Sequence, residues 1–388
     1  MRCRNGKRQK RGGRTMKKVG IITWHYCNNY GSFFQVFALQ SYIESIGYEA
    51  QIINYRTPGS SAAKKIIKKA IYRLERLTPG RLVLILRRIF DSSEIFGFKF
   101  WAARNRLLRR TELILDKNKL SKKARDYYAV VCGSDQIWAP RGLDTAYMLD
   151  FVPDDVKKIS YAASIGFNYI PDDMRDEYKK YISRIDSVSV REGTGVKLLK
   201  ECCDICAADV LDPTFLVDRS NWENLASETL GEDNFIFCYF LNQNHKYKKT
   251  VLDAAERLGY KIAGVSANGK DADWLELNND ITPEEFLERV KKAKLIFTDS
   301  FHGTALSMIM NRDFYVFERF ESSDPVNQNS RIYSILEKAG LSDRIVGADG
   351  NIEPFGHIDY DRTNGLLETE RQKSKAFLKE ALGDTEYD

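Results

Sequence analysis

Residues 295–306, LIFTDSFHGTAL, decide the fold class that we predict for this 388-residue chain. The first four residues are apolar and predict a short buried strand, and the apolar run that begins at Thr304 predicts a helix. Polar residues, among them Asp299, Ser300 and His302, join the two elements. Backbone N–H groups at a helix N-terminus attract anions, phosphate above all, so we expect the His302 imidazole to lie beside an anion.

The rest of the chain repeats this alternation of strand and helix. Residues 19–24 predict a strand, residues 32–46 an amphipathic helix and residues 49–55 a second strand, which together form a βαβ unit. Further strands are predicted at residues 128–132, 158–162, 186–190, 234–241, 260–265, 295–298 and 313–317, and further helices at residues 192–201, 246–258, 283–292, 304–310 and 329–339. The expected fold class is therefore α/β, with two parallel-sheet domains facing a cleft.

We expect a domain boundary within residues 218–233. The predicted segments are a basic, disordered tail at residues 1–15, a first domain at residues 16–217 and a second domain at residues 218–388 that ends in a final helix. A basic helical insertion at about residues 60–125 is predicted within the first domain. Ligands of such sheets bind beyond the carboxyl ends of the strands, where the polar loops of this chain lie.

The sequence contains two basic segments, and each of them has two alternative roles. Residues 1–15 hold seven Lys or Arg and no acid, which accounts for the net charge of +6, and this tail is either simply solvated or binds nucleic acid or lipid headgroups. Residues 56–110 carry fifteen Lys or Arg against three acids. This second segment is either an insertion packed on its domain or a peripheral membrane surface for anionic lipid or a lipid-linked substrate.

The sequence lacks the signatures of several classes of protein and of several kinds of binding site. No run of 18 apolar residues and no apolar signal-peptide core occurs, so we expect a cytoplasmic protein, with contact at the inner face of the membrane as the alternative. Residues 202–206 contain a C-x-x-C spacing without the second pair of ligands that a structural zinc site needs, so reduced thiols are expected. No metal constellation, P-loop or G-x-G-x-x-G motif is present, and we expect no cofactor.

Seven pieces of the sequence, in order, resemble the polysaccharide pyruvyl transferase family. They are GIITWH with NNYGSFFQ, counted together as one piece (residues 20–25 and 28–35), VVCGSDQIW (130–138), YAASIG (161–166), SVRE (189–192), DPT (212–214), TDSFHG (298–303) and NSRI (329–332). The resemblance implies two Rossmann-like domains arranged as in the glycosyltransferase B architecture. It also implies transfer of a pyruvyl group from phosphoenolpyruvate, as co-substrate, to a sugar of a polysaccharide or of its lipid-linked precursor, forming a cyclic ketal.

This chemistry assigns expected roles on the donor side. A phosphate and a carboxylate need cationic donors, which Arg provides bidentately, and the enol carbon needs a proton donor. We expect His302 to contact the donor and transfer the proton. Relatives in the family carry Arg where Ser300 stands, so Arg331 and Arg191 are expected to hold the donor, with a structural ion pair as the alternative for either. Ser300 itself, Gly303, Thr304 and His245 are the remaining expected donor contacts.

The loops of the first domain are expected to hold the acceptor. Asp135 is predicted to hydrogen-bond the sugar or to accept a proton from its hydroxyl group. Gly31 permits close approach of a ligand to the backbone. The other expected acceptor contacts, each with a purely structural role as the alternative, are His25, Asn28, Asn29, Tyr30, Ser134 and Trp138.

Two other functions remain open at this stage. A glycosyltransferase of the same architecture would use a nucleotide sugar in the same cleft. A basic nucleic-acid-binding or scaffold protein is supported only by the two basic segments, and no specific nucleic acid is expected.

Overall fold

The computed structural model describes residues 16–26, 29–57, 98–231, 234–241, 245–266, 274–275, 281–321, 324, 327–347, 350, 352 and 356–383. The predicted tail at residues 1–15 and residues 58–97 of the basic insertion lie outside this part of the chain. The helices in the described part include none that combines the length and the apolar character needed to cross a bilayer.

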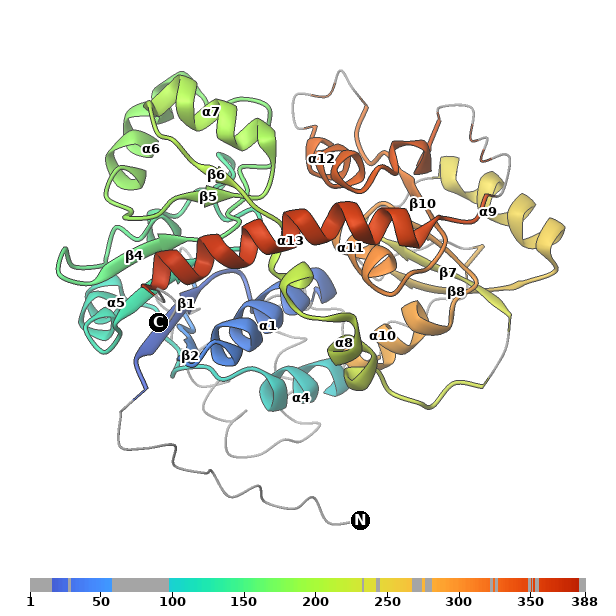
Figure 1. The fold of residues 1–388 in the computed structure, drawn as a ribbon, viewed down its shortest axis with the longest axis horizontal. Coiled ribbons are helices and arrows are strands. Elements are labelled where there is room, and N and C mark those ends of the chain that lie inside the picture. The colour runs from blue at the N-terminus through green and yellow to red at the C-terminus, as the bar shows by residue number, and fades with distance from the viewer. Residues whose placement is uncertain are drawn as a thin grey trace, which may run out of the picture.

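A parallel sheet with the strand order β2-β1-β3-β4 forms the centre of the first domain (Figure 1). Its strands are β1 (Lys18–Ile22), β2 (Glu49–Ile52), β3 (Ala129–Cys132) and β4 (Lys157–Ser160). A short parallel pair, β5 (Ser189–Val190) and β6 (Ala208–Asp209), adjoins β4 through a bridge between Ile159 and Ser187. The central strands β1 and β3 are nearly continuous apolar runs because helices cover both faces of the sheet.

A second parallel sheet, with the order β11-β10-β9-β7-β8, forms the centre of the second domain. Its strands are β7 (Phe235–Phe240), β8 (Lys261–Ser266), β9 (Leu295–Thr298), β10 (Phe314–Phe317) and β11 (Ile345–Val346). All described pairings in both sheets are parallel. The predicted fold class, α/β with two parallel sheets, is confirmed.

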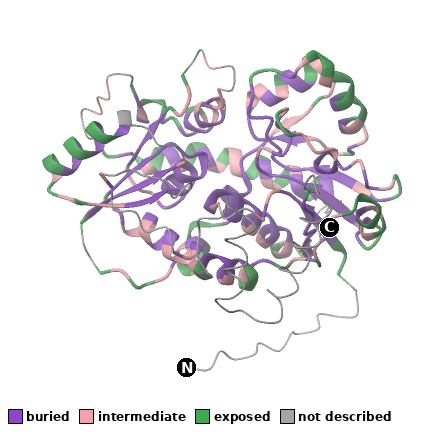
Figure 2. Ribbon diagram, turned by 180° about the vertical axis from the view of Figure 1, so that it is seen from behind, coloured by how far each residue is buried: buried purple, intermediate pink, exposed green. Residues whose placement is uncertain are grey.

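Helices surround and join the two sheets. They are α1 (Tyr30–Ser45), α4 (Phe98–Leu107), α5 (Lys117–Ala124), α6 (Arg175–Ile182), α7 (Gly193–Cys203), α8 (Arg219–Leu225), α9 (His245–Leu258), α10 (Pro283–Lys292), α11 (Phe301–Ile309), α12 (Ser330–Ala339) and α13 (Tyr360–Leu382), with short 3₁₀ turns η1 (Thr145–Met148), η2 (Asp172–Met174), η3 (Pro213–Leu216) and η4 (Ser342–Arg344). Figure 2 shows most of the strand residues of both sheets as buried, while α7, α9 and other outer helices expose one face.

The two domains share one hydrophobic core. Helix α1 of the first domain packs against η3, α11 and α10, so its side chains meet those of the second domain. Tyr30 stacks on Phe286 of α10 at a ring distance of 4.5 Å, and Phe34 meets Trp222 of α8 edge to face at 5.7 Å. Because this core is continuous, the facing ends of the two sheets are held in a fixed relation.

The last helix, α13, belongs to both domains. It starts in the second domain and runs across to the first, where Tyr48 and Tyr128 donate hydrogen bonds to the carbonyl of Leu382 at 3.0 and 3.1 Å (Figure 1). In its middle, Ser374 Oγ accepts from the N–H of Leu211 at 2.8 Å. The final helix was predicted as part of the second domain alone, and the structure extends that assignment.

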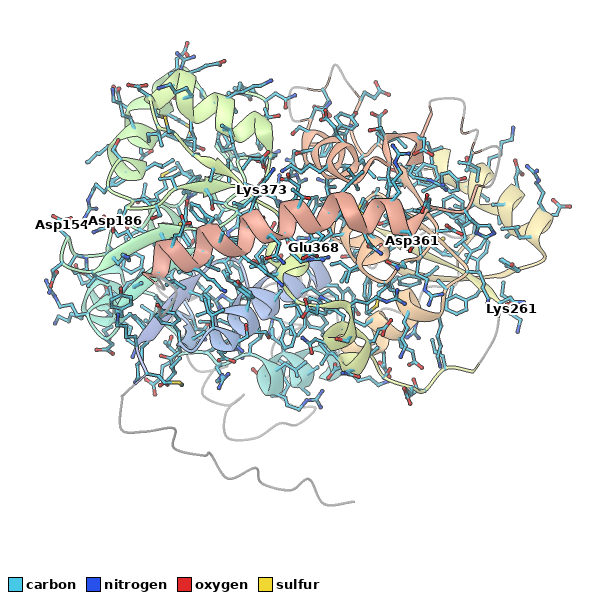
Figure 3. All side chains as sticks on the ribbon, viewed as in Figure 1. Asp154, Asp186, Lys261, Asp361, Glu368 and Lys373 are labelled. Atoms are coloured by element: carbon cyan, nitrogen blue, oxygen red, sulfur yellow. The ribbon has the colours of Figure 1, made fainter. Side chains whose placement is uncertain are left out.

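Charged side chains follow the outer side of α13, which Figure 3 shows at Asp361, Glu368 and Lys373. Buried residues of the helix, among them Leu367 and Leu378, belong to the shared core. This division into an apolar and a charged face fits a surface helix that packs along one side.

Two helix starts show how local sequence sets the boundaries. Helix α10 begins as predicted, because Thr282 and Glu285 form a reciprocal capping box. Helix α11 begins at Phe301, three residues before the predicted start at Thr304, because Ser300 acts as its N-cap. His302 therefore lies within the first helical turn. Cys202 and Cys203, at the end of α7, and Cys206, three residues beyond it, are free thiols, as predicted.

Candidate functional site

The N-terminal turns of α1 and α11 meet at Gly31 and His302. A Cβ atom added to Gly31 would lie 2.3 Å from Nδ1 of His302, so only glycine allows the imidazole to approach α1 this closely. His302 is buried, with 7% of its surface exposed. Gly31 was predicted to admit a ligand, and the structure shows that it admits the His302 ring.

The carboxylate of Asp212 holds this histidine. Its Oδ2 atom lies 3.5 Å from Nε2 of His302 and accepts from Arg191 Nη1 at 2.8 Å. Its Oδ1 atom accepts from the N–H and the hydroxyl of Thr214 at 3.0 and 2.8 Å. Burial alone would raise the pKa of Asp212, but His302, Arg191 and the Thr214 N–H together hold that pKa well below its ordinary value. Asp212 is therefore an ionised carboxylate that fixes the imidazole.

Several buried polar atoms around Asp212 have no hydrogen-bond partner among the described residues. They include Nε2 of His302, Nε and Nη2 of Arg191 and Oε2 of Glu192. Arg191 lies over the Phe301 ring at 4.2 Å, and its Nε atom is 4.0 Å from Oε2 of Glu192. Buried polar groups are normally satisfied, so such a cluster indicates the place of a bound ligand or of water.

Two more arginines complete a cationic cluster. Arg331, in the first turn of α12, and Arg319, just beyond β10, both donate to Oε1 of Gln328, at 3.4 and 3.0 Å. Burial, with Arg191 and Arg319 nearby, lowers the pKa of Arg331 to about 9. Neither Arg319 nor Arg331 forms a salt bridge with a described residue. This cluster is suited to an anion with more than one negative charge.

Asp135 lies on the first-domain side of the cluster. Its Oδ2 atom accepts from Ser32 Oγ at 2.7 Å and its Oδ1 atom from the N–H of Gln136 at 2.9 Å. The backbone of Asp135 has a φ of 74°, in the left-handed region, which costs a non-glycine residue about 1–2 kcal/mol. Strained backbone of this kind often occurs at functional sites. Gln136 reaches across and donates to Gln328 at 2.9 Å.

A family model described as polysaccharide pyruvyl transferase matches residues 29–319, about three quarters of the sequence. The chain belongs to the polysaccharide pyruvyl transferase family. Membership in this family implies that the chain is a transferase enzyme. The match includes the loops that carry Asp135, Arg191, Asp212, His302 and Arg319.

Solved structures of low sequence identity also resemble the chain. An α-glucosyltransferase in complex with UDP and a 13-mer DNA has a TM-score of 0.48 at 12% identity, with 94% of this chain and 95% of that chain covered. UDP-GlcNAc 2-epimerase from Neisseria meningitidis bound to UDP-GlcNAc has a TM-score of 0.48 at 8% identity, with 95% and 100% covered. A search of curated proteins finds no match.

Ser300, Gly303 and Thr304, which were predicted as donor contacts of this pyruvyl transferase family member, are used inside α11. Ser300 Oγ accepts from the N–H of Gly303 at 3.3 Å, and the Ser300 carbonyl accepts from the N–H and the hydroxyl of Thr304 at 3.0 Å each. Gly303 is pressed against Thr298, whose Oγ1 would lie 2.3 Å from an added Cβ. We therefore no longer expect Gly303 and Thr304 to contact the donor, because hydrogen bonds within the helix satisfy their N–H groups.

Two predicted acceptor contacts are core residues. Trp138 is fully buried and donates from Nε1 to the carbonyl of Tyr147 at 2.9 Å. Tyr30 is fully buried in the shared core, and its hydroxyl donates to the carbonyl of Ile281 at 2.9 Å. These predictions are wrong because neither side chain presents a surface to a sugar.

Two other predicted residues position parts of the site through hydrogen bonds. Asn29 is the N-cap of α1, and its Oδ1 accepts from the N–H of Ser32 at 3.1 Å. Ser134 is fully buried, with Oγ at 2.7 Å from the Ala162 carbonyl and 3.0 Å from Oδ2 of Asp212. Ser134 therefore positions Asp212, and we no longer expect it to contact the acceptor.

His25 does not join the cluster. His25 is 1% exposed, with Nδ1 at 2.9 Å from the Thr23 carbonyl and Nε2 at 2.9 Å from Oδ1 of Asn54, so it is a structural histidine. His245 starts α9, but its side chain lies outside the described part of the structure, as does Asn28. The described residues include no group of three or more His, Cys, Asp or Glu placed to hold a metal ion.

Sequence reasoning missed Asp212, Arg319 and Gln328 as site residues. Asp212 was recognised only as part of a family motif. Arg319 could have been suspected from its place two residues after β10, whose Val316 pairs with Thr298 of β9. A residue just beyond β10 therefore lies near the start of α11.

The buried His25 makes stability depend on pH. Burial and the nearby Arg110 lower the pKa of His25 to about 3, so only the unfolded chain gains this proton as the pH falls from 6.5 toward 3. We expect His25→Gln to reduce the loss of unfolding free energy between pH 7.5 and pH 5.0 by about 2 kcal/mol, measured by urea denaturation. Equal losses in the variant and the unsubstituted protein would contradict this.

The Gly31–His302 contact can be tested by a double-mutant cycle. Gly31→Ala should lower the unfolding free energy by about 1–3 kcal/mol, because the new methyl group overlaps the imidazole. In a His302→Ala background most of this cost should disappear. Gly365→Ala, in α13 with open space around it, is the matched control and should be neutral or stabilising. An equal cost of Gly31→Ala in both backgrounds would show that the contact is absent.

Proposed function

We propose that this chain transfers the pyruvyl group of phosphoenolpyruvate to two hydroxyl groups of one sugar, which forms a cyclic ketal. The observation that carries the proposal is the cluster of Arg191, Arg319 and Arg331 beside a histidine that an ionised Asp212 holds. Family membership supports the same reaction type. The acceptor we propose is a sugar of a polysaccharide or of its lipid-linked precursor.

The charges of the donor match those of the cluster. Phosphoenolpyruvate carries a phosphate and a carboxylate, and it has no cationic group to neutralise them. The three guanidinium groups provide donors for both groups, and Arg191 keeps Nε and Nη2 unpaired although only 4% of the residue is exposed. A bound anion would satisfy these buried donors, which supports donor binding at this place.

The reaction requires one proton on carbon and the loss of two protons from the acceptor. Protonation of the methylene carbon of the donor makes the neighbouring carbon electrophilic. One sugar hydroxyl adds to that carbon, phosphate leaves, and a second hydroxyl closes the ketal. Of the two hydroxyl protons released, one balances the proton taken up by carbon and the other leaves with hydrogen phosphate.

The geometry suggests which residues move these protons. His302 is our candidate for the donor to carbon, because its Nε2 faces Asp212 yet has no hydrogen-bond partner among the described residues. Asp212 is a positioning residue, because its depressed pKa makes it a poor base. Asp135 has 8% of its surface exposed and lies on the opposite side of the cluster, so it is our candidate for binding the sugar hydroxyls.

An acceptor on a lipid carrier would place the protein at the inner face of the membrane. The basic segment at residues 56–110, for which such a contact is one of the two expected roles, lies mostly outside the described residues. Peripheral membrane contact therefore stays a prediction.

The test compares phosphate release from labelled phosphoenolpyruvate with nucleotide release from nucleotide sugars, across a panel of saccharides and lipid-linked saccharides. We expect acceptor-dependent phosphate release. His302→Ala should lower kcat about 100-fold or more, which is the range for loss of a general acid. Asp212→Asn should lower kcat more than it raises KM, and Arg331→Ala should mainly raise KM for the donor.

Arg125→Ala is the matched control for removal of one arginine, because Arg125 pairs with Asp155 on the surface. It should change neither constant. Acceptor-dependent nucleotide release without phosphate release would support the glycosyltransferase alternative instead. Near-native turnover of His302→Ala would remove the role that we assign to the imidazole.

A further inference from the structure

One neutral oxygen lies at the centre of the cationic cluster. Oε1 of Gln328 accepts hydrogen bonds from Arg319 Nη2 at 3.0 Å, Arg331 Nη2 at 3.4 Å and Gln136 Nε2 at 2.9 Å. All three partners are N–H donors, which fixes the amide with its oxygen toward them. Three donors, two of them cationic, thus converge on an acceptor that carries no charge.

The arginines around this oxygen have no carboxylate partner in the described part of the chain. Arg331 is 8% exposed, and Arg191 and Arg319 lie near enough to affect its titration. Glu192 and Asp135 lie near enough to Arg331, and Asp299 near enough to Arg319, to affect their titration. The hydrogen bonds that Asp135 accepts come from Ser32 and Gln136. Buried positive charges in this proportion favour an anion over a neutral amide.

We propose that the amide oxygen of Gln328 occupies the position of the donor phosphate in the absence of donor. When the donor binds, phosphate oxygens replace this amide oxygen as the acceptors for Arg319 and Arg331. The inference rests on the proposed function. It adds to that function a subsite for the donor phosphate, and it assigns to Gln328 the role of the side chain that the phosphate displaces. Two guanidinium groups that meet at one oxygen position suit a dianion with three terminal oxygens. Arg191 is less suited to the dianion, because Asp212 already neutralises part of its charge.

Gln136 connects this subsite to the first domain. A Cβ on Gly166 would lie 2.1 Å from Nε2 of Gln136, so the backbone behind the amide holds it toward Gln328. Once Gln328 leaves, the same N–H can donate to the phosphate. Because Gln136 directly follows Asp135, donor binding then fixes the loop that we propose for the sugar hydroxyls.

Inorganic phosphate binding to the full-length protein tests the subsite without any transfer reaction. Its Kd is measured by calorimetry and by thermal shift for the unsubstituted protein, Gln328→Glu, Gln328→Ala and Arg319→Ala. Gln372→Glu, on the exposed side of α13, matches the added charge, and Arg125→Ala matches the lost arginine. Pyruvate, which has a carboxylate but no phosphate, is titrated in parallel.

Gln328→Glu should raise the Kd for phosphate tenfold or more, because a tethered carboxylate then competes for both arginines. Arg319→Ala should raise it by a similar factor. Gln328→Ala should lower the Kd several-fold, since nothing then has to be displaced. Both controls should stay within twofold of the unsubstituted protein, and pyruvate binding should change little in Gln328→Glu.

The proposal is overturned if Gln328→Glu binds phosphate normally, or if Gln328→Ala binds it more weakly, which would make Gln328 a direct contact. A larger change for pyruvate than for phosphate would assign the subsite to the carboxylate and overturn the phosphate assignment. The Kd of Gln328→Glu for phosphate tests the subsite even if Arg319→Ala fails to fold. If the phosphate results are as expected but the unsubstituted protein shows no pyruvyl transfer, only the proposed function is overturned.

Discussion

The ion pair between Asp212 and Arg191 is the contact on which the site depends. Both side chains are almost fully buried, and the Asp212 carboxylate also binds the start of η3 and lies within ion-pair distance of His302. A charge in such surroundings needs all of these partners, because an unpaired buried carboxylate would take up a proton. The pair thereby links β5 of the first domain to α11 of the second, and it defines where the imidazole lies.

The shared core explains how two sheets can hold one such pair. Helix α1 packs against elements of both domains, and α13 runs along both. The facing carboxyl ends of β1, β3, β9 and β10 then present their loops to each other. In this family member the residues proposed to hold the donor come from loops after β5 and β10 and from α12, whereas Asp135 follows β3. Our assignment of these residues to donor and acceptor therefore distributes the chemistry over both domains.

Much of the fold could be predicted from the sequence, because apolar strand runs and capped helices are local signals. The start of α10 and the strand β9 matched their predicted bounds. Side-chain direction was much less predictable. Trp138 and Tyr30 occur in polar loop sequences, yet both point into the core, and His25 satisfies both ring nitrogens inside its own domain. Conversely, Gln328 and Arg319 become partners through the course of the connection between β10 and α12, for which the sequence has no periodic signal.

The contact of His302 with Gly31 crosses the boundary between the domains, and it leaves no free space between ring and backbone. The imidazole is carried by α11, while the surface that sets its position is the first turn of α1. Separation of the two sheets would remove that surface from the ring. The position of the imidazole therefore depends on the shared core that holds the two domains together.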